Sequence, residues 1–190
     1  MIRIGLVGEN PSDTGAIRAL LRKAIADQVD FVDLIRDVNG SNLENNFHKN
    51  RFRREYELLK REGGGVDLVV FIRDLDDLET NRERVLQRKS YFNEWNKTVD
   101  EKGIFLLNIF ELEALIWADI EGYNLKYGTS IPPLPDPMLI WEPKEELKKH
   151  IRYSEGDSPK IFEEALRVDE VEKNCRYFAA FLSEFKQHIP

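Results

Sequence analysis

Residues 66–77 read VDLVVFIRDLDD, an apolar run that ends in a cluster of aspartates. We interpret residues 66–72 as a buried strand of a parallel sheet, because such strands are near-continuous hydrophobic runs. Open α/β sheets present their ligands at the carboxyl ends of the strands. The strand should therefore deliver Asp74, Asp76 and Asp77 to that edge. One residue separates Asp74 from Asp76, so in an extended backbone their side chains point the same way.

Carboxylates held together in this way repel each other unless a proton or a cation lies between them. Oxygen ligands alone favour a hard cation such as Mg²⁺ or Mn²⁺. Glu9 follows the predicted strand 2–7 as the aspartates follow strand 66–72, so Glu9, Asp74 and Asp76 are expected to converge. The alternative is that the aspartates are ordinary turn and cap residues, where Asp is common.

Strand and helix patterns alternate four times along the first two thirds of the chain. Strands are predicted at 2–7, 31–38, 66–72 and 104–109, with helices beginning near Ser12 or Asp13 and at 49–62, 79–99 and 111–119. A loop at 39–46 follows the second strand. This order predicts an α/β fold with a mostly parallel four-stranded sheet and helices on both faces.

The remainder of the chain has a different pattern. Five prolines between residues 131 and 143 favour a loop lying over the core. Helices are predicted at 144–150, 158–166 and 171–188, the last with Val171, Cys175, Phe178, Leu182 and Phe185 on one stripe. We therefore divide the chain into an α/β core, residues 1–122, and a helical C-terminal extension, residues 123–190, packed on it.

Composition excludes several classes of protein. The chain has 190 residues, a net charge of −7 and a sequence pI of about 5.2, which exclude a uniformly basic nucleic-acid binder but not a local basic patch. With Cys175 as its only cysteine it can form neither an intrachain disulfide nor a Cys-rich zinc site. It shows no signal-peptide pattern and no apolar run of the roughly 20 residues that span a membrane. These features predict a cytoplasmic protein that does not contact membranes.

One segment of this acidic chain is basic. Its candidate nucleic-acid contacts are Lys49, Arg51, Arg53 and Arg54, with Phe52 and Tyr56 between the charges. Lys and Arg contacts to phosphate would give salt-dependent, sequence-independent binding. The alternative is a solvated helix whose glutamates pair with the arginines. Trp95, Trp117 and Trp141 are interpreted as core or loop anchors rather than base-stacking platforms.

Three motifs in order resemble the Toprim-like proteins. They are GENPSD at residues 8–13, DLD at 74–76 and ELEA at 111–114. More narrowly, the chain resembles small prokaryotic Toprim-like proteins of uncharacterised function, related to OLD-type nucleases and linked to mobile-element or phage-defence loci. The tail carries two further motifs of that group, PKEEL at 143–147 and CRYF at 175–178.

The resemblance implies a Toprim/Rossmann-like sheet and Mg²⁺-dependent phosphoryl transfer on DNA or RNA. Glu9 matches a glutamate that acts as general acid/base or metal ligand, and Asp74 and Asp76 match the metal-binding pair. Glu111 and Glu113 match later acidic positions, of which Glu111 is the better candidate ligand. Asn10 departs from the family, which often has Gly there.

Basic residues near these acids are candidate partners for phosphate. Lys144 or Lys160 is a candidate to stabilise the transition state, the alternative for each being a solvated lysine. Arg73 is expected either to neutralise the acidic cluster or to hold a phosphate.

Three functions are compatible with these residues. The first is a metal-dependent phosphodiesterase or endonuclease that acts on nucleic acid, in phage or mobile-element defence. The second is a non-catalytic Toprim-like module that binds a partner protein. That partner could be a separately encoded ATPase, because the chain has no GxxxxGK[ST] motif. The third, a phosphoacceptor receiver domain, ranks last, because it needs an acidic pair after the first strand and a lysine after the last.

Overall fold

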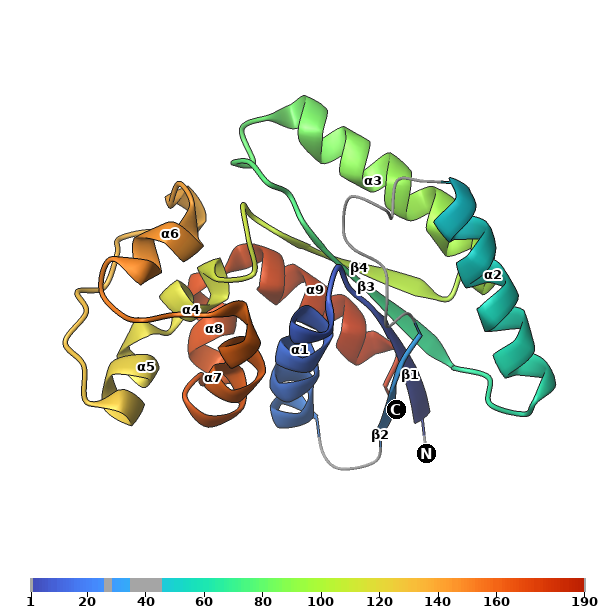
Figure 1. Ribbon diagram of the computed structural model, residues 1–190, viewed down its shortest axis with the longest axis horizontal. Helices are drawn as coiled ribbons and strands as arrows, with labels where there is room; N and C mark the ends of the chain where they lie inside the picture. Colours follow the sequence, from blue (N-terminus) through green and yellow to red (C-terminus); the bar gives the residue numbers. More distant parts are fainter. Residues whose placement is uncertain (1, 26–28, 35–45, 190) are drawn as a thin grey trace.

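The computed structural model describes residues 2–25, 29–34 and 46–189. Its sheet is parallel throughout and has the order β2-β1-β3-β4. The strands are β1 (Ile2–Val7), β2 (Val29–Asp33), β3 (Leu68–Asp74) and β4 (Gly103–Asn108). Helices cover both faces of the sheet (Figure 1), which confirms the predicted α/β fold.

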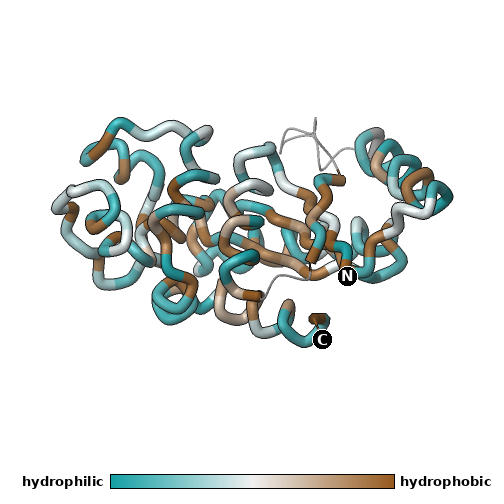
Figure 2. Tube along the Cα trace, turned by 90° about the horizontal axis from the view of Figure 1, so that it is seen from below, coloured by the Kyte–Doolittle hydropathy of each residue, from teal (hydrophilic) through white to brown (hydrophobic). Residues whose placement is uncertain are grey.

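Alternation along β3 assigns the two faces of the sheet. Leu68, Val70 and Ile72 belong to the larger hydrophobic cluster, which also contains residues of α1 (Pro11–Ala24) and α9 (Arg176–Gln187). Val69 and Phe71 point to the opposite face. There a second cluster holds residues of α2 (Asn46–Arg61) and α3 (Arg82–Asn96), including Phe52, Tyr56 and Trp95. Hydrophobic segments accordingly run through the interior of the molecule (Figure 2).

The C-terminal helices complete the larger core. They are α4 (Ala114–Ala118), α5 (Ile120–Tyr127), α6 (Pro143–Lys148), α7 (Ser158–Glu164) and α8 (Val168–Asn174), with 3-10 turns at Pro137–Leu139 and Glu155–Asp157. A further 3-10 turn, Lys97–Val99, follows α3 and contributes Val99 to the second cluster. Helix α7 lies against α1, and α9 lies against β4. Residue 122, the predicted boundary, falls within α5. Within the described residues, no helix is both long and apolar enough to cross a membrane.

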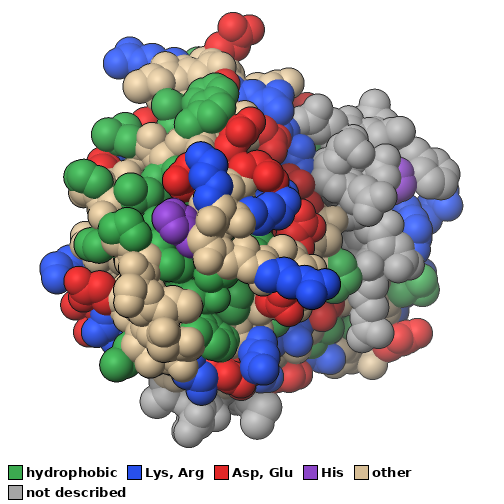
Figure 3. Space-filling model, turned by 60° about the vertical axis from the view of Figure 1, so that its left-hand side comes forward, with side chains coloured by type: hydrophobic (Ala, Val, Ile, Leu, Met, Phe, Trp, Pro, Cys, Tyr) green, Lys and Arg blue, Asp and Glu red, His purple; other side chains and the backbone are tan. Residues whose placement is uncertain are grey.

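Some apolar side chains of this part of the chain lie at the surface. Figure 3 turns the C-terminal helices toward the viewer and shows hydrophobic groups between charged ones. Leu125, Leu139 and Trp141 are among the exposed large hydrophobic residues. By contrast, the five residues of the apolar stripe predicted on helix 171–188 are all buried.

Several element boundaries differ from the prediction. The cap of α1 is Asn10 rather than Ser12 or Asp13, because its side chain accepts the backbone N–H groups of both those residues. The predicted final helix is two helices, because Cys175 adopts an extended backbone (φ −127°, ψ 96°) between α8 and α9. The predicted second strand extends beyond the described residues, and most of the predicted loop 39–46 lies outside them.

A buried carboxylate ties the C-terminal helices together and gives a first prediction. Asp119 accepts hydrogen bonds from the backbone N–H groups of Gly122 and Arg167 and from the Arg167 guanidinium. Asp119→Ala should lower the free energy of unfolding by about 3 kcal/mol, because it leaves buried donors unpaired. Urea denaturation measures this loss. The exposed Asp169→Ala is the control and should change stability by less than about 0.5 kcal/mol; equal effects would refute the assigned role.

Candidate functional site

Three neighbouring strands bring polar residues to one edge of the sheet. The chain adds β2 on one side of β1 and then adds β3 and β4 on the other side, so the strand order reverses between β1 and β3. Open α/β sheets bind their ligands at such a switch point. Glu9 follows β1, Asp74 ends β3 and Asn108 ends β4. Asp74 and Asn108 are register partners, and the Asn108 amide Nδ2 donates to Asp74 Oδ1 at 2.9 Å. The predicted convergence of Glu9 with Asp74 therefore occurs at this edge.

Two further carboxylates complete this cluster: Asp13, interpreted from the sequence only as a possible helix start, and Glu113, which ranked below Glu111 as a candidate ligand. Asp13 lies in the first turn of α1, and Glu113 immediately precedes α4; both are buried. The negative charges of Asp13, Glu9 and Glu113 all act on Asp74. We call Glu9, Asp13, Asp74 and Glu113 the acidic cluster. Asp13 belongs to the motif GENPSD and Glu113 to the motif ELEA, but neither was chosen from the sequence as a metal ligand.

The acidic cluster is electrostatically strained. Burial, followed by the charges of Asp13 and Glu9, raises the pKa of Asp74 well above its ordinary value. Burial and the charge of Glu9 raise the pKa of Asp13 to about 7. Burial also raises the pKa of Glu113 and of Glu9, although the Arg73 guanidinium opposes the rise at Glu9. Groups in this state bind protons or cations more readily than solvated carboxylates do.

An unpaired acceptor lies beside the acidic cluster. Asn108 is buried, and within the described part of the chain its Oδ1 has no hydrogen-bond partner. Buried amide oxygens are rarely left unpaired, and an unpaired one beside carboxylates is a position where an ion, a water or a ligand group can bind. Sequence reasoning did not single out Asn108 as a site residue.

These donors fit a hard divalent cation by their chemistry, because all are oxygens and four are carboxylates. As the side chains stand, no three Asp, Glu, His or Cys residues within the described ranges are arranged to hold one metal ion. Glu9 is ion-paired with Arg73. A cation binding to Glu9 must therefore compete with that guanidinium.

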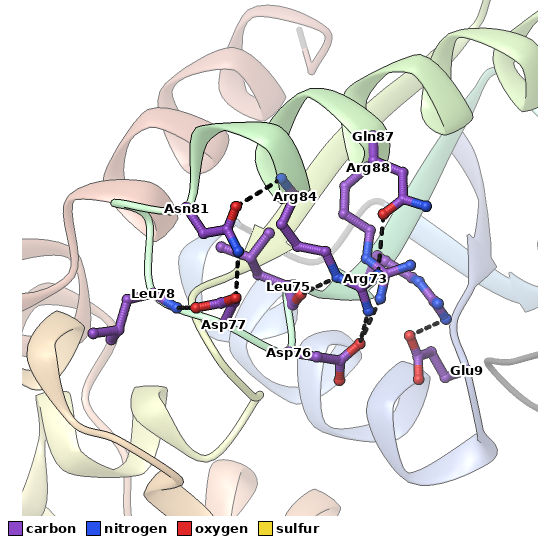
Figure 4. Close-up of polar contacts among 10 residues, drawn as sticks. All are labelled: Glu9, Arg73, Leu75, Asp76, Asp77, Leu78, Asn81, Arg84, Gln87 and Arg88. Atoms are coloured by element: carbon purple, nitrogen blue, oxygen red, sulfur yellow. Dashed lines mark hydrogen bonds and ion pairs between the residues drawn. The ribbon is translucent and has the colours of Figure 1, made fainter.

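Asp76 occupies a different position from the one predicted. It lies beyond β3 with φ = 56°, so the extended backbone expected for residues 74–76 is wrong for Asp76. Its side chain is 51% exposed and forms ion pairs with Arg84, at 3.3 Å, and with Arg88 (Figure 4). Arg73 and Glu9 lie beside this group in the same view. The arginines thus form a cationic side to the acidic cluster, which favours the neutralising interpretation of Arg73.

The loops after β3 and β4 are locked together by their backbones. Asp76 N–H donates to the Phe110 carbonyl at 2.9 Å, and Phe110 N–H donates to the Asp77 carbonyl at 3.0 Å. Phe110 has φ = 59°, a left-handed conformation that costs free energy in a non-glycine residue. Asp77 accepts from Leu78 N–H and Asn81 Nδ2, so the predicted alternative of a turn residue applies to this aspartate.

Glu111 and Glu113 were predicted to lie within a helix at 111–119. Helix α4 begins only at Ala114, so both glutamates precede it. Glu111 accepts the backbone N–H of Lys144 at 3.1 Å, and Lys144 Nζ lies 3.7 Å from Glu111 and 2.9 Å from Glu155. These carboxylates raise the pKa of Lys144 despite its partial burial. Lys144 is therefore held at the site, whereas Lys160 is exposed on α7.

The basic segment forms much of α2. Lys49 pairs with Glu94 at 2.9 Å and Arg51 with Glu55 at 2.8 Å, while Arg53 and Arg54 are exposed. Phe52 and Tyr56 were expected to interleave with the surface charges, but both are buried in the core beneath α2. Neither ring is therefore available at the surface of α2 to stack on a nucleic-acid base.

The three tryptophans separate into two groups. Trp95 and Trp117 are buried in the two hydrophobic clusters, which confirms them as core residues. Trp141 is 60% exposed and packs edge-on against Phe110, with ring centroids 4.9 Å apart. Phe110 directly precedes Glu111, so this exposed ring lies close to the site.

Comparison with known proteins identifies one family. No curated protein and no solved structure matches the chain. The family model described as a domain of unknown function (DUF4276) matches residues 8–186, which include all members of the acidic cluster and Asn108. The chain therefore belongs to the DUF4276 family.

Proposed function

We propose that this protein is a metal-dependent phosphodiesterase, or a related phosphoryl-transfer enzyme, that acts on nucleic acid. The observation that carries the proposal is the acidic cluster with the unpaired Oδ1 of Asn108 beside it. Buried carboxylates that repel one another lower stability, and such sites in proteins are commonly functional. A bound cation would offset the repulsion and give the unpaired amide oxygen a partner.

Asp74 and Asp13 would hold the cation, with Glu9, Glu113 and the Asn108 amide as the further oxygen donors. Mg²⁺ or Mn²⁺ suits this set. When bound, such an ion would neutralise charge on the phosphate and lower the pKa of a water molecule bound to it. Glu9 is also a candidate to accept a proton, since burial raises its pKa above the ordinary value of a glutamate. We assign Asp76 and Glu111, which are engaged by arginine and lysine, to the rim of the site.

Cationic groups around the acidic cluster are suited to a phosphodiester substrate. Lys144 lies over Glu111, and Arg84 and Arg88 lie beside Asp76. The exposed Arg53 and Arg54 would contact the nucleic-acid backbone. We extend the proposal to a Toprim-like relationship with OLD-type nucleases, supported by the order of the acidic motifs along the chain.

The test is a cleavage assay on plasmid DNA, single-stranded DNA and RNA, run beside Mg²⁺ and Mn²⁺ titrations by calorimetry. We expect cation binding, and cleavage that is lost in chelator. Absence of both would refute the proposal.

A second candidate function is a non-catalytic module that binds a partner protein such as a separately encoded ATPase. The observation that favours it is an exposed apolar groove in the C-terminal part of the chain. This groove has a volume of about 430 Å³ and is lined mainly by Leu134, Pro135, Leu139, Ile140 and Trp141. Exposed aromatic and aliphatic groups of this kind are typical of interaction sites. Cation binding without cleavage of any substrate would favour this candidate.

Nucleic-acid binding by α2 gives a further prediction. Arg53→Gln/Arg54→Gln should weaken binding and reduce the slope of log K against log salt by about 2, because two phosphate contacts are lost. The measurement is fluorescence anisotropy with a labelled oligonucleotide at several salt concentrations. Lys173→Gln/Lys186→Gln removes the same charge from exposed positions on α8 and α9 and should leave the slope unchanged. Equal slopes for both double variants would refute a contact through α2.

A further inference from the structure

A buried hydrogen-bond chain reaches the acidic cluster from the C-terminal part of the molecule. The Tyr153 hydroxyl donates to Glu113 Oε1 at 2.8 Å, and the same hydroxyl is hydrogen-bonded to Ser158 Oγ. All three residues are buried, Glu113 to 5% exposure and Tyr153 to 7%. Residues far apart in the sequence are thus joined through side chains alone.

The donors in this chain can be assigned from the number of protons available. A tyrosine hydroxyl carries one proton, and the bond to Glu113 uses it when the carboxylate is ionised. Ser158 must then be the donor to the Tyr153 oxygen. Hydrogen bonds in series polarise one another, so the Ser158 bond strengthens the bond from Tyr153 to Glu113.

The electrostatics agree with this direction. Burial raises the pKa of Glu113, and the hydrogen bond from Tyr153 opposes that rise by stabilising the ionised carboxylate. Burial and the negative charge of Glu113 in turn raise the pKa of Tyr153, which keeps the phenol protonated and able to donate. The carboxylate also acts on Asp74 and Asp13, which places it within the acidic cluster.

We propose that Tyr153, supported by Ser158, is a positioning residue that orients Glu113 toward a cation bound at the acidic cluster. The inference rests on the proposed function, because it requires that a cation binds there. It assigns to the segment between α6 and α7 a role in completing the site. Groups that orient metal ligands in this way typically contribute 10- to 100-fold to metal affinity.

The test is Mn²⁺ affinity measured by calorimetry for the full chain and a set of variants. Tyr153→Phe keeps the ring and removes only the hydroxyl, and should weaken Mn²⁺ binding about 10-fold. Tyr56→Phe is the matched control: Tyr56 is also buried, and its hydroxyl contacts Val99 and Asp100 away from the acidic cluster. This control should bind Mn²⁺ as the wild type does.

A double-mutant cycle separates positioning from general loss of structure. In a Glu113→Gln background, Tyr153→Phe should cause no further loss of affinity, because its effect acts through Glu113. An equal loss in both backgrounds, or a wild-type affinity for Tyr153→Phe, would overturn the inference. If Tyr153→Phe does not fold, as judged by circular dichroism, Ser158→Ala in the same cycle decides the question by the same criteria. Absence of Mn²⁺ binding by the wild-type protein would instead overturn the proposed function, and this inference with it.

Discussion

Asp74→Asn is expected to abolish binding of Mg²⁺ and Mn²⁺ while making the cation-free protein more stable. Asp74 is the residue on which the charges of the other members of the acidic cluster act. Its loss should reduce cation affinity by about 100-fold or more, since even residues that only orient ligands contribute 10- to 100-fold. Any cleavage activity should fall with the affinity, because charge on the phosphate is then left without compensation.

The same substitution removes a buried negative charge from a group of like charges. Each unit by which the pKa of Asp74 is raised corresponds to about 1.4 kcal/mol of unfavourable interaction in the ionised form. Asn keeps the shape of the side chain, so the free energy of unfolding at pH 8 in chelator should rise by about 1 kcal/mol or more. Opposite changes in function and stability are expected where a site is strained for its activity.

Asp76→Asn is the matched control for Asp74→Asn. The same charge is removed two residues away, from a side chain that is exposed and paired with Arg84 and Arg88. Calorimetric Mn²⁺ titration and urea denaturation of both variants provide the comparison. We expect Asp76→Asn to retain most of the cation affinity and to gain no stability. A larger loss of affinity for Asp76→Asn than for Asp74→Asn would contradict our placement of the site.

The second large effect is a decrease in stability with rising pH in the absence of cations. The pKa of Asp13 is raised from its ordinary value of 3.8 to about 7 in the folded protein. Between these values the folded state holds a proton that the unfolded state has lost. The free energy of unfolding must therefore fall as pH rises through this window. Asp74, whose pKa is also raised, contributes with the same sign.

Asp13→Asn should remove part of this pH dependence. The variant keeps an oxygen that can accept the Asn10 N–H, as Asp13 does at 3.2 Å in the cap of α1. At pH 8 in chelator it should be more stable than the wild type by about 2 to 4 kcal/mol, the upper value corresponding to the full pKa difference. At pH 4, where Asp13 is protonated in the folded state, the two proteins should differ little.

Urea denaturation between pH 4 and pH 8, followed by tryptophan fluorescence, measures both profiles. Asp169→Asn, an exposed residue in the first turn of α8, serves as the control and should follow the wild-type profile. A wild-type stability that rises with pH across the window would contradict the assignment. So would a profile for Asp13→Asn parallel to that of the wild type.

The sheet could be predicted from the sequence because its strands are local patterns. The apolar runs that became β1, β3 and β4 are short, buried and separated by helical periodicity, and their order leaves few topologies. Helix boundaries could not be predicted where several neighbouring residues could serve as the cap, or where an apolar stripe continued across a break in the backbone. Asn10 rather than Ser12 caps α1, and the apolar stripe of 171–188 continues across the break at Cys175.

The positions of Glu9 and Asp74 could also be anticipated, since both follow strands whose carboxyl ends meet at one edge. The relation of Asp74 to Asp76 could not. Their spacing predicts a shared direction only while the backbone stays extended, and Asp76 has a left-handed φ held by its bond to the Phe110 carbonyl. A hydrogen bond between loops that are distant in sequence leaves no mark on the local pattern.

Local patterns along the chain were enough to predict the α/β fold and the edge of the sheet at which acidic residues gather. The packing of distant segments sets which carboxylates are buried together. It places Asp13 and Glu113 near Asp74, pairs Asp76 with Arg84 and Arg88, and brings Tyr153 to Glu113. Secondary structure follows from interactions between residues close in the chain. The pKa of a carboxylate depends instead on burial and on charges within a few ångströms, which are set by how distant segments pack.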